Sequence, residues 1–383
     1  MKKISIGLFL LLIVAFSTST PIIAYAKEAV DINDMANKLN TEEMDEIISS
    51  LTEDQKSIFN AQSFKDKLLS IVSGESDDGI LSFILSSLNL SIKEVLPFIF
   101  SLLGICIALG VMKAFCGESK SGVYTVIRFV FILLCCTILF SQLTSVIISV
   151  KDLVSQIKQQ IDGIFPILLT LMSAIGSSKS VLVYQPVIAI LSSGIMKIIT
   201  VLVLPCFILS IVFEVASNLS DKVNLKNMAA FFSSSMKWLL GTAFFAFLAF
   251  LSVKGVTAAV YDGIHIRATK FALNKYIPII GGYLSEGYNL VFSGGVIIKN
   301  GVGLCAIVLL LSVLLPIFMK ILLLSLSTDL LSALSQPIGA EEASNLFKGV
   351  SKGLKNLLAI VFGASFLYFI FLLLIICTGN ASL

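Results

Sequence analysis

Long apolar stretches separated by short polar segments fill the chain from about residue 95 to its end. A bilayer core about 30 Å thick requires roughly 20 residues of apolar helix, and residues 357–377 supply this length without a charged side chain. By the same criterion, membrane-spanning helices are predicted at residues 95–112, 129–149, 198–217, 238–253, 301–318 and 357–377. The pattern predicts an all-α fold, that of a polytopic helical membrane protein.

Residues 164–196 form one further apolar element, which polar and helix-breaking residues interrupt. The polar run 177–180 separates two apolar pieces, and Pro166 and Pro186 lie one in each piece. This pattern allows either a tight hairpin of two spans or a re-entrant pair, and hydropathy does not choose between them. The expected total is therefore about 7–8 spans.

The N-terminal segment has the pattern of a cleavable secretion signal. Two lysines precede a short apolar run over residues 4–16, and Ala24 and Ala26 supply the small side chains that signal peptidase requires. Cleavage would make Lys27 the new N-terminus and place it outside the cytosol. The alternative is an uncleaved first span, which the short length of the apolar run disfavours.

Residues 27–94 are expected to form a small helical head outside the cytosol, between the signal peptide (1–26) and a transmembrane domain (95–383). Residues 27–79 carry 13 acidic side chains against 5 lysines. Residues 52–55 have the spacing of a capping box, which marks the start of a helix. Because so small a head buries little core, we expect it to need a partner or the membrane for order.

The distribution of basic residues predicts how the chain is oriented in the membrane. Starting outside and counting 164–196 as two crossings, the cytosolic segments would be 113–128, Lys179, 218–237 and 319–356. These hold 11 lysines and arginines, against 8 in the membrane-proximal segments on the other side. This excess has the sign that the positive-inside rule requires, and it places the C-terminus outside.

The sequence contains few residues of the types that form catalytic, metal or nucleotide sites. The chain has a single histidine, and its seven cysteines lie almost entirely within apolar runs, so no metal-ligand spacing is present. There is no phosphate-binding loop of the GxxxxGK[ST] kind, and no array of basic and aromatic residues suited to nucleic acid. The sequence therefore predicts no catalytic, cofactor or metal site, and a protein that is not an enzyme.

The segment 254–300 differs from the rest of the chain and contains the candidate functional residues. On a helix, Arg267 and Lys270 share a basic stripe beside an apolar strip that includes Phe271, which is the pattern of a helix lying on a membrane surface. Proline and glycine then interrupt the helix before a second apolar run, which suggests a re-entrant or pore-proximal element. The candidate functional or partner-contact residues are Asp262, Arg267, Lys270, Phe271, Pro278, Gly281, Gly282 and Glu286.

These candidates also have simpler structural interpretations. Arg267 and Lys270 could anchor the helix to lipid headgroups, and Asp262 could cap the helix that follows it. Glu286 is flanked by apolar and glycine-rich residues, where a carboxylate inside the membrane would be costly and commonly functional. The same carboxylate would cost little if it lay at the membrane interface.

Residues 262–287 read DGIHIRATKFA…YIPIIGGYLSEG. With the signal, the acidic head and the number of spans, this run resembles the stage III sporulation protein AE family of endospore-forming bacteria, over essentially the whole chain. The resemblance implies a multi-pass protein of the mother-cell-derived outer forespore membrane. Its implied partners are the other stage III A-operon proteins, including a secretion-type ATPase, and a forespore membrane protein.

The function implied by this resemblance is that of a membrane subunit of a trans-envelope channel or secretion-like complex. Such a complex links mother cell and forespore and is needed for forespore development after engulfment. Basic side chains of the cytosolic segments, among them Lys348, Lys352 and Lys355, would face the other machinery. A stand-alone small-molecule permease is the alternative, whereas an intramembrane enzyme would need a paired nucleophile and base that the sequence lacks.

Overall fold

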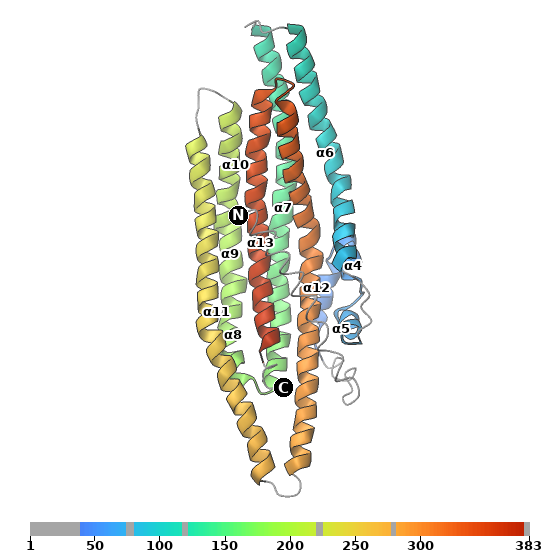
Figure 1. Cartoon of the computed structure of the whole chain (residues 1–383), viewed down its shortest axis with the longest axis vertical. Coiled ribbons are helices and arrows are strands. Elements are labelled where there is room, and N and C mark those ends of the chain that lie inside the picture. Colours follow the sequence, from blue (N-terminus) through green and yellow to red (C-terminus); the bar gives the residue numbers. More distant parts are fainter. Residues whose placement is uncertain (1–38, 74–79, 117–121, 220–224, 277–280, 379–383) are drawn as a thin grey trace.

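The computed structural model describes residues 39–73, 80–116, 122–219, 225–276 and 281–378, and every regular element within these ranges is a helix (Figure 1). The predicted signal peptide and its cleavage site, Ala24, Ala26 and Lys27, lie outside the described residues.

Within the described residues, three short helices precede a set of long ones. The short helices are α3 (Glu42–Ser49), α4 (Glu53–Phe59) and α5 (Phe64–Ser73). The first two long helices are α6 (Ile80–Cys116) and α7 (Gly122–Ala174). A composite helix follows, built from α8 (Ser178–Ala189), η2 (Ile190–Ile195), α9 (Met196–Ile198), η3 (Ile199–Val203) and α10 (Leu204–Leu219), in which η2 and η3 are π-helical. The last three are α11 (Lys226–Tyr276), α12 (Gly281–Ser335) and α13 (Glu341–Cys377).

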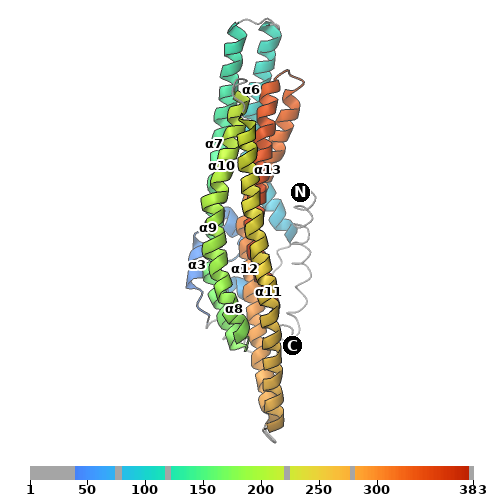
Figure 2. The ribbon, with the colours of Figure 1, turned by 90° about the vertical axis from the view of Figure 1, so that its left-hand side faces the viewer.

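The long helices run side by side along one axis, as Figures 1 and 2 show. At a rise of 1.5 Å per residue, the 53 residues of α7 extend about 80 Å, more than twice the thickness of a bilayer core. The α12–α13 turn, with Gly339 at φ 79°, lies near one end of the bundle, where α6 and α7 extend beyond it (Figure 1). The α7–α8 turn, with Gly176 at φ 84°, lies at the other end.

Six helices in the described part of the chain are long and apolar enough to cross a membrane, rather than the 7–8 expected. Residues 164–196 explain the difference, because they do not form separate spans. They are the end of α7 and the beginning of the composite helix, joined by the tight turn at Gly176. The six candidate spans are Ser87–Phe115, Val126–Ala174, Ser178–Asn218, Lys226–Ser252, Phe292–Ser335 and Glu341–Cys377.

The length of α7 also corrects the expected orientation of Lys179. This lysine follows the end of α7, whereas residues 113–128 include its beginning, so the two lie at opposite ends of the bundle. Moving Lys179 to the other side changes the count of basic residues from 11 against 8 to 10 against 9. The positive-inside rule therefore gives no orientation for this chain.

The short N-terminal helices have no separate core but share that of the long helices. Met44, Phe59 and Phe64 are fully buried in the same cluster as α7, α12 and α13. The carbonyl oxygen of Phe64 lies 3.9 Å from the Cys305 sulfur of α12. The predicted capping box forms at the start of α4, where Thr52 and Gln55 exchange side chain–backbone hydrogen bonds of 3.0 and 3.4 Å.

The segment 254–300 continues the long helices. Residues 254–276 are the last part of α11, in place of a separate surface-lying helix, and residues 281–300 begin α12. The expected break at Pro278 falls between the described ends of these helices. Figure 1 shows the α11 and α12 ends projecting past the α7–α8 turn.

Candidate functional site: a polar layer around α13

The residues predicted from sequence lie along the projecting helix pair. Asp262, Arg267, Lys270 and Phe271 belong to α11, so Asp262 lies within a helix and does not cap one. The Phe271 side chain is 59% exposed, and Ile264, two turns earlier on the same face, is similarly exposed. This agrees with the predicted apolar strip.

The remaining candidates lie on or before the other helix of the pair. Gly281, Gly282 and Glu286 fall in the first two turns of α12, and Pro278 lies outside the described residues. The sequence motif is thus gathered at one end of the bundle, remote from the α12–α13 turn.

A second set of polar side chains, outside the residues predicted from the sequence, lies between α12 and α13. Asp329 accepts hydrogen bonds from the Lys355 ammonium and from the Ser351 hydroxyl, both at 2.6 Å. Ser351 also lies 3.4 Å from the Ser325 hydroxyl. The Asp329 charge is therefore balanced by Lys355, and its second oxygen is also hydrogen-bonded.

Serines nearer the turn extend this polar contact. The Ser332 hydroxyl donates to the carbonyl oxygen of Ser344 at 2.9 Å, and the Ser344 hydroxyl donates to that of Ser332 at 2.7 Å. Small residues let helix backbones approach closely, and hydroxyls then bridge the two helices. The Lys113 ammonium of α6 binds the Gly339 carbonyl at 3.1 Å and so ties α6 to the same turn.

The local sequence explains why these groups meet. Ser325, Asp329 and Ser332 are spaced by four and three residues, so they share one face of α12. Ser344, Ser351 and Lys355 share a face of α13 in the same way. The short α12–α13 turn makes the two helices antiparallel, and the faces meet in register.

A small polar pocket lies on the opposite side of α13, against α10 and α11. Its lining includes Glu214, Ser233, Lys352 and Asn356. The Asn356 amide donates to the Ser233 hydroxyl at 3.1 Å. Gly349 allows Glu214 to approach, because a Cβ there would lie 2.9 Å from the Glu214 Cγ atom. Glu214 is therefore packed against α13, whereas its position at the end of a span suggests a solvated side chain.

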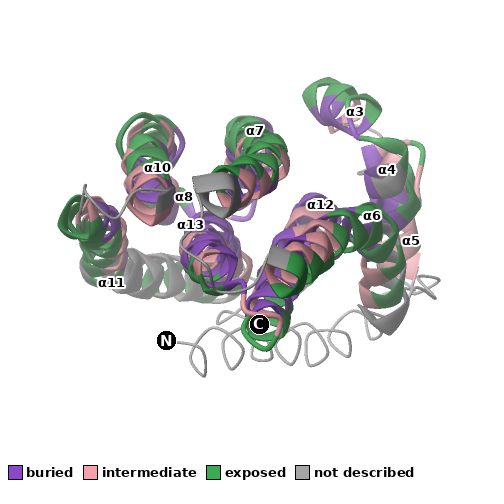
Figure 3. Ribbon diagram, turned by 90° about the horizontal axis from the view of Figure 1, so that it is seen from above, coloured by how far each residue is buried: buried purple, intermediate pink, exposed green. Residues whose placement is uncertain are grey.

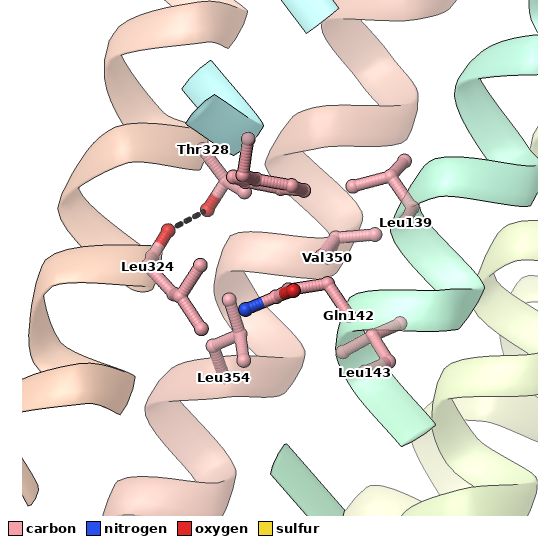
Figure 4. Close-up of a pocket in the computed structure, with 8 residues that line it drawn as sticks. Leu139, Gln142, Leu143, Leu324, Thr328, Val350 and Leu354 are labelled. Carbon is pink, nitrogen blue, oxygen red and sulfur yellow. Dashed lines mark hydrogen bonds between the residues drawn. The ribbon is translucent and has the colours of Figure 1, made fainter. Parts of the chain in front are cut away.

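A second small pocket lies between α7 and the α12–α13 pair and is mainly apolar. Figure 4 shows the Gln142 amide reaching between Val350 and Leu354. The Thr328 hydroxyl in this pocket donates to the Leu324 carbonyl at 2.9 Å. Polar side chains thus flank α13 on several sides. We refer to them, with the α13 side chains that they contact, as the polar layer; they come from α7 (Gln142), α12 (Thr328, Asp329 and the serines), α10 (Glu214) and α11 (Ser233).

The polar layer offers charge balance rather than catalysis. Asp329 is neutralised by Lys355 and is therefore a poor base for the Ser351 hydroxyl. Across the described ranges, no three histidine, cysteine, aspartate or glutamate side chains are close enough to hold a metal ion. The pockets on either side of α13 are too small for an organic cofactor.

Two features of the sequence could have revealed the polar layer. Asp329 lies in an apolar run of the segment 319–356, and a charge in such a run requires a partner. The seven-residue spacing of Ser325 and Ser332 repeats in Ser344 and Ser351 across a short turn. Lys355 is the complementary charge, although it was assigned to a segment facing other proteins.

The helices and the polar layer define an all-helical protein with six candidate membrane-spanning helices, in the class of polytopic membrane proteins. The chain belongs to the stage III sporulation protein AE family, whose sequence model matches residues 62–379. Stage III sporulation protein AE of Bacillus subtilis (strain 168) is 27% identical to this chain over 221 residues. That match covers 58% of this chain and 55% of the Bacillus protein, about half of its length. No solved structure matches the chain.

Proposed function

We propose that this chain is a membrane subunit of a trans-envelope channel or secretion-like complex that links mother cell and forespore. In this role it is needed for forespore development after engulfment. The observation that carries the proposal is family membership over residues 62–379, since the family is named for stage III of sporulation.

The arrangement of the described helices supports a subunit rather than an enzyme. Asp329, the carboxylate that binds the Ser351 hydroxyl, is already paired with Lys355 and is a poor base for that hydroxyl. Energy for transport would then come from another chain, for which the secretion-type ATPase of the same operon is the proposed source. The other proposed partners are the remaining stage III A-operon proteins and a forespore membrane protein.

The projecting α11–α12 pair is the proposed surface for one of these partners. It extends past the rest of the bundle (Figure 2) and carries the exposed side chains Ile264 and Phe271. The proposed location of the chain is the mother-cell-derived outer forespore membrane. A partner in the facing forespore membrane would then meet this projecting end.

Gene deletion and complementation test the proposal. Removing the gene from the spore-forming host should arrest forespores after engulfment is complete, and the intact chain supplied from the mother cell should restore heat-resistant spores. Affinity purification of the restored chain after cross-linking should recover the other operon products. Normal spore yield without the gene would contradict the proposal. Solute uptake by liposomes containing this chain alone would favour the permease alternative.

A further inference from the structure

We propose that the small polar pocket between α10, α11 and α13 binds one alkali cation, Na⁺ or K⁺, through the Glu214 carboxylate. The hydroxyl groups of Ser210 and Ser233 and the side chain of Asn356 line the same pocket and supply further oxygen atoms. The proposal does not depend on the complex proposed above, because it concerns the isolated chain.

The Glu214 carboxylate has no counter-charge, in contrast to the other half-buried carboxylates of the long helices. Asp329 is paired with Lys355, and Glu342 is paired with Arg128. Within the described ranges, Glu214 has neither an ion pair nor a hydrogen-bond donor on its carboxylate. It lies in a candidate membrane-spanning helix, where an unbalanced carboxylate is costly and commonly functional. A cation in the pocket would balance this charge.

Glycines of α13 allow α10 to come close enough for Glu214 to line the pocket. Figure 3 shows α10 and α11 on one side of α13, with α12 on the other side. A Cβ on Gly349 would lie 2.9 Å from the Glu214 Cγ atom and 3.4 Å from one of its carboxylate oxygens. A Cβ on Gly353 would lie 2.5 Å from the Cδ1 atom of Ile211. Small residues permit this close approach of two helices, and the carboxylate is therefore packed against α13.

Two buried hydroxyl groups lie beside the carboxylate. Ser210 precedes Glu214 by one helical turn on the same face of α10, and its hydroxyl donates to the Ala229 carbonyl at 2.9 Å. The Ser233 hydroxyl accepts a hydrogen bond from the Asn356 amide at 3.1 Å. A hydroxyl oxygen has two lone pairs, so each serine keeps acceptor capacity for a ligand. Oxygen atoms of this kind are the ligands that hard cations prefer.

The charges around the pocket favour an ion with a single positive charge. Of the described residues that line it, Glu214 is the one acid and Lys352 is the one base. Lys352 is exposed and does not pair with Glu214. Its ammonium group opposes a bound cation, and it would oppose a divalent ion twice as strongly as a monovalent one. The pocket is too small for an organic cation, and it offers no histidine or cysteine to a transition metal.

Equilibrium binding of radioactive sodium or rubidium ions to the purified full-length chain in a non-ionic detergent tests the proposal. Rubidium is the analogue of potassium, and choline chloride keeps the ionic strength constant because choline is too large for the pocket. One of the two ions should bind saturably, with one ion per chain. The same ion should raise the unfolding temperature, since a ligand of the folded state stabilises that state. Lack of saturable binding by both ions would overturn the proposal.

Three variants test whether the ion lies at Glu214. Glu214→Gln keeps the shape of the side chain and removes its charge, so it should abolish saturable binding. Ser233→Ala keeps the charge and removes one oxygen ligand, so it should weaken binding. Lys352→Met removes the opposing charge and should therefore strengthen binding. A purely structural role of Glu214 would not produce this increase.

Glu341→Gln is the matched control, because Glu341 is an exposed carboxylate at the start of α13. This variant should bind the ion as the unchanged chain does. Helical circular dichroism and a monodisperse elution profile show that each variant is folded. Unchanged affinity in Glu214→Gln or Ser233→Ala, or weaker binding in Lys352→Met, would overturn the proposal. These measurements need no sporulation partner, so their outcome is separate from that of the complex proposed above.

Discussion

Asp329 of α12 and Lys355 of α13, 26 residues apart in sequence, form a 2.6 Å ion pair that joins the two central helices. Each side chain is partly exposed in the isolated bundle, and Ser351 supplies a second hydrogen bond to the carboxylate. The pair is the charged part of a contact that otherwise consists of serines. Its strength depends on how far water is excluded around it.

Removing one member of this pair should destabilise the protein more than removing both. Lys355→Ala should lower the free energy of unfolding by about 2–3 kcal/mol, because it leaves the Asp329 carboxylate without a counter-charge. The double variant Asp329→Ala/Lys355→Ala should recover part of this loss. Thermal unfolding in detergent, followed by circular dichroism, measures both effects.

Lys348→Ala is the matched control for this experiment, since Lys348 is exposed on the same helix. It should change stability by less than about 0.5 kcal/mol. The stability losses of Lys355→Ala and Asp329→Ala are compared with that of the double variant. If the two single losses sum to the loss in the double variant, Asp329 and Lys355 act independently.

Gly303 should not tolerate a methyl group. A Cβ at this position would lie 2.4 Å from the Ile376 Cγ1 atom of α13, and the branched isoleucine has few rotamers to avoid it. Gly303→Ala should therefore cost about 1–3 kcal/mol of stability. Gly104→Ala is the control, because nothing lies within 4 Å of its Cβ position. That change should be neutral or stabilising, by up to about 1 kcal/mol. Similar unfolding temperatures for the two variants would contradict the close approach of α12 and α13.

Lys299 should hold the last turn of α13 in place. Its fully buried ammonium donates to the carbonyl oxygens of Ile376, at 3.0 Å, and of Thr378. Lys299→Met would leave these carbonyls without their donor, at a cost of about 1–3 kcal/mol. Hydrogen exchange of the backbone amides in residues 372–378 should accelerate.

Lys197→Met, which changes an exposed lysine, should leave exchange in this region unchanged. Tyr184→Phe provides a second test, because the Tyr184 hydroxyl lies 2.8 Å from that of Thr378. It should give a smaller acceleration confined to the same turn. Unchanged exchange in Lys299→Met would mean that α13 ends without this support.

The sequence motif at the projecting end should matter for sporulation. Arg267→Glu should reduce the number of heat-resistant spores more than Lys151→Glu, which reverses an exposed charge on α7. The reason is that Arg267 belongs to the proposed partner-contact surface. Spore counts at equal protein levels measure the difference. Equal spore counts for the two variants would contradict a partner-contact role and would mean that the motif only anchors the helix to the membrane surface.

The helical class and the apolar segments were predictable because helices that cross or fill a bundle need long runs without charge. The family was also predictable, from the run at residues 262–287, and the profile match over residues 62–379 confirms it. The span count was wrong because hydropathy cannot distinguish a long helix that continues past the membrane from a new crossing. Residues 164–196 contain the proline and serine residues of a two-span hairpin or a re-entrant pair, yet they form the end of α7 and the beginning of the composite helix.

The polar layer was missed for a different reason. Asp329 and Lys355 are joined only through the geometry of the α12–α13 turn, and no local pattern connects positions so far apart. Glu214 was expected to be a solvated helix end, but its approach to Gly349 depends on how α10 packs against α13. Burial against protein and exposure to lipid also give the same apolar composition, as residues 301–318 illustrate.

The short turn centred on Gly339 has a consequence for how the protein is made. A translocon that released α12 before α13 was synthesised would leave the Asp329 carboxylate in hydrocarbon with no cation beside it. The opposite charge is encoded only a few helical turns further on, so both helices can leave the translocon together as a neutral hairpin. We therefore expect α12 and α13 to insert as one paired unit instead of one helix at a time.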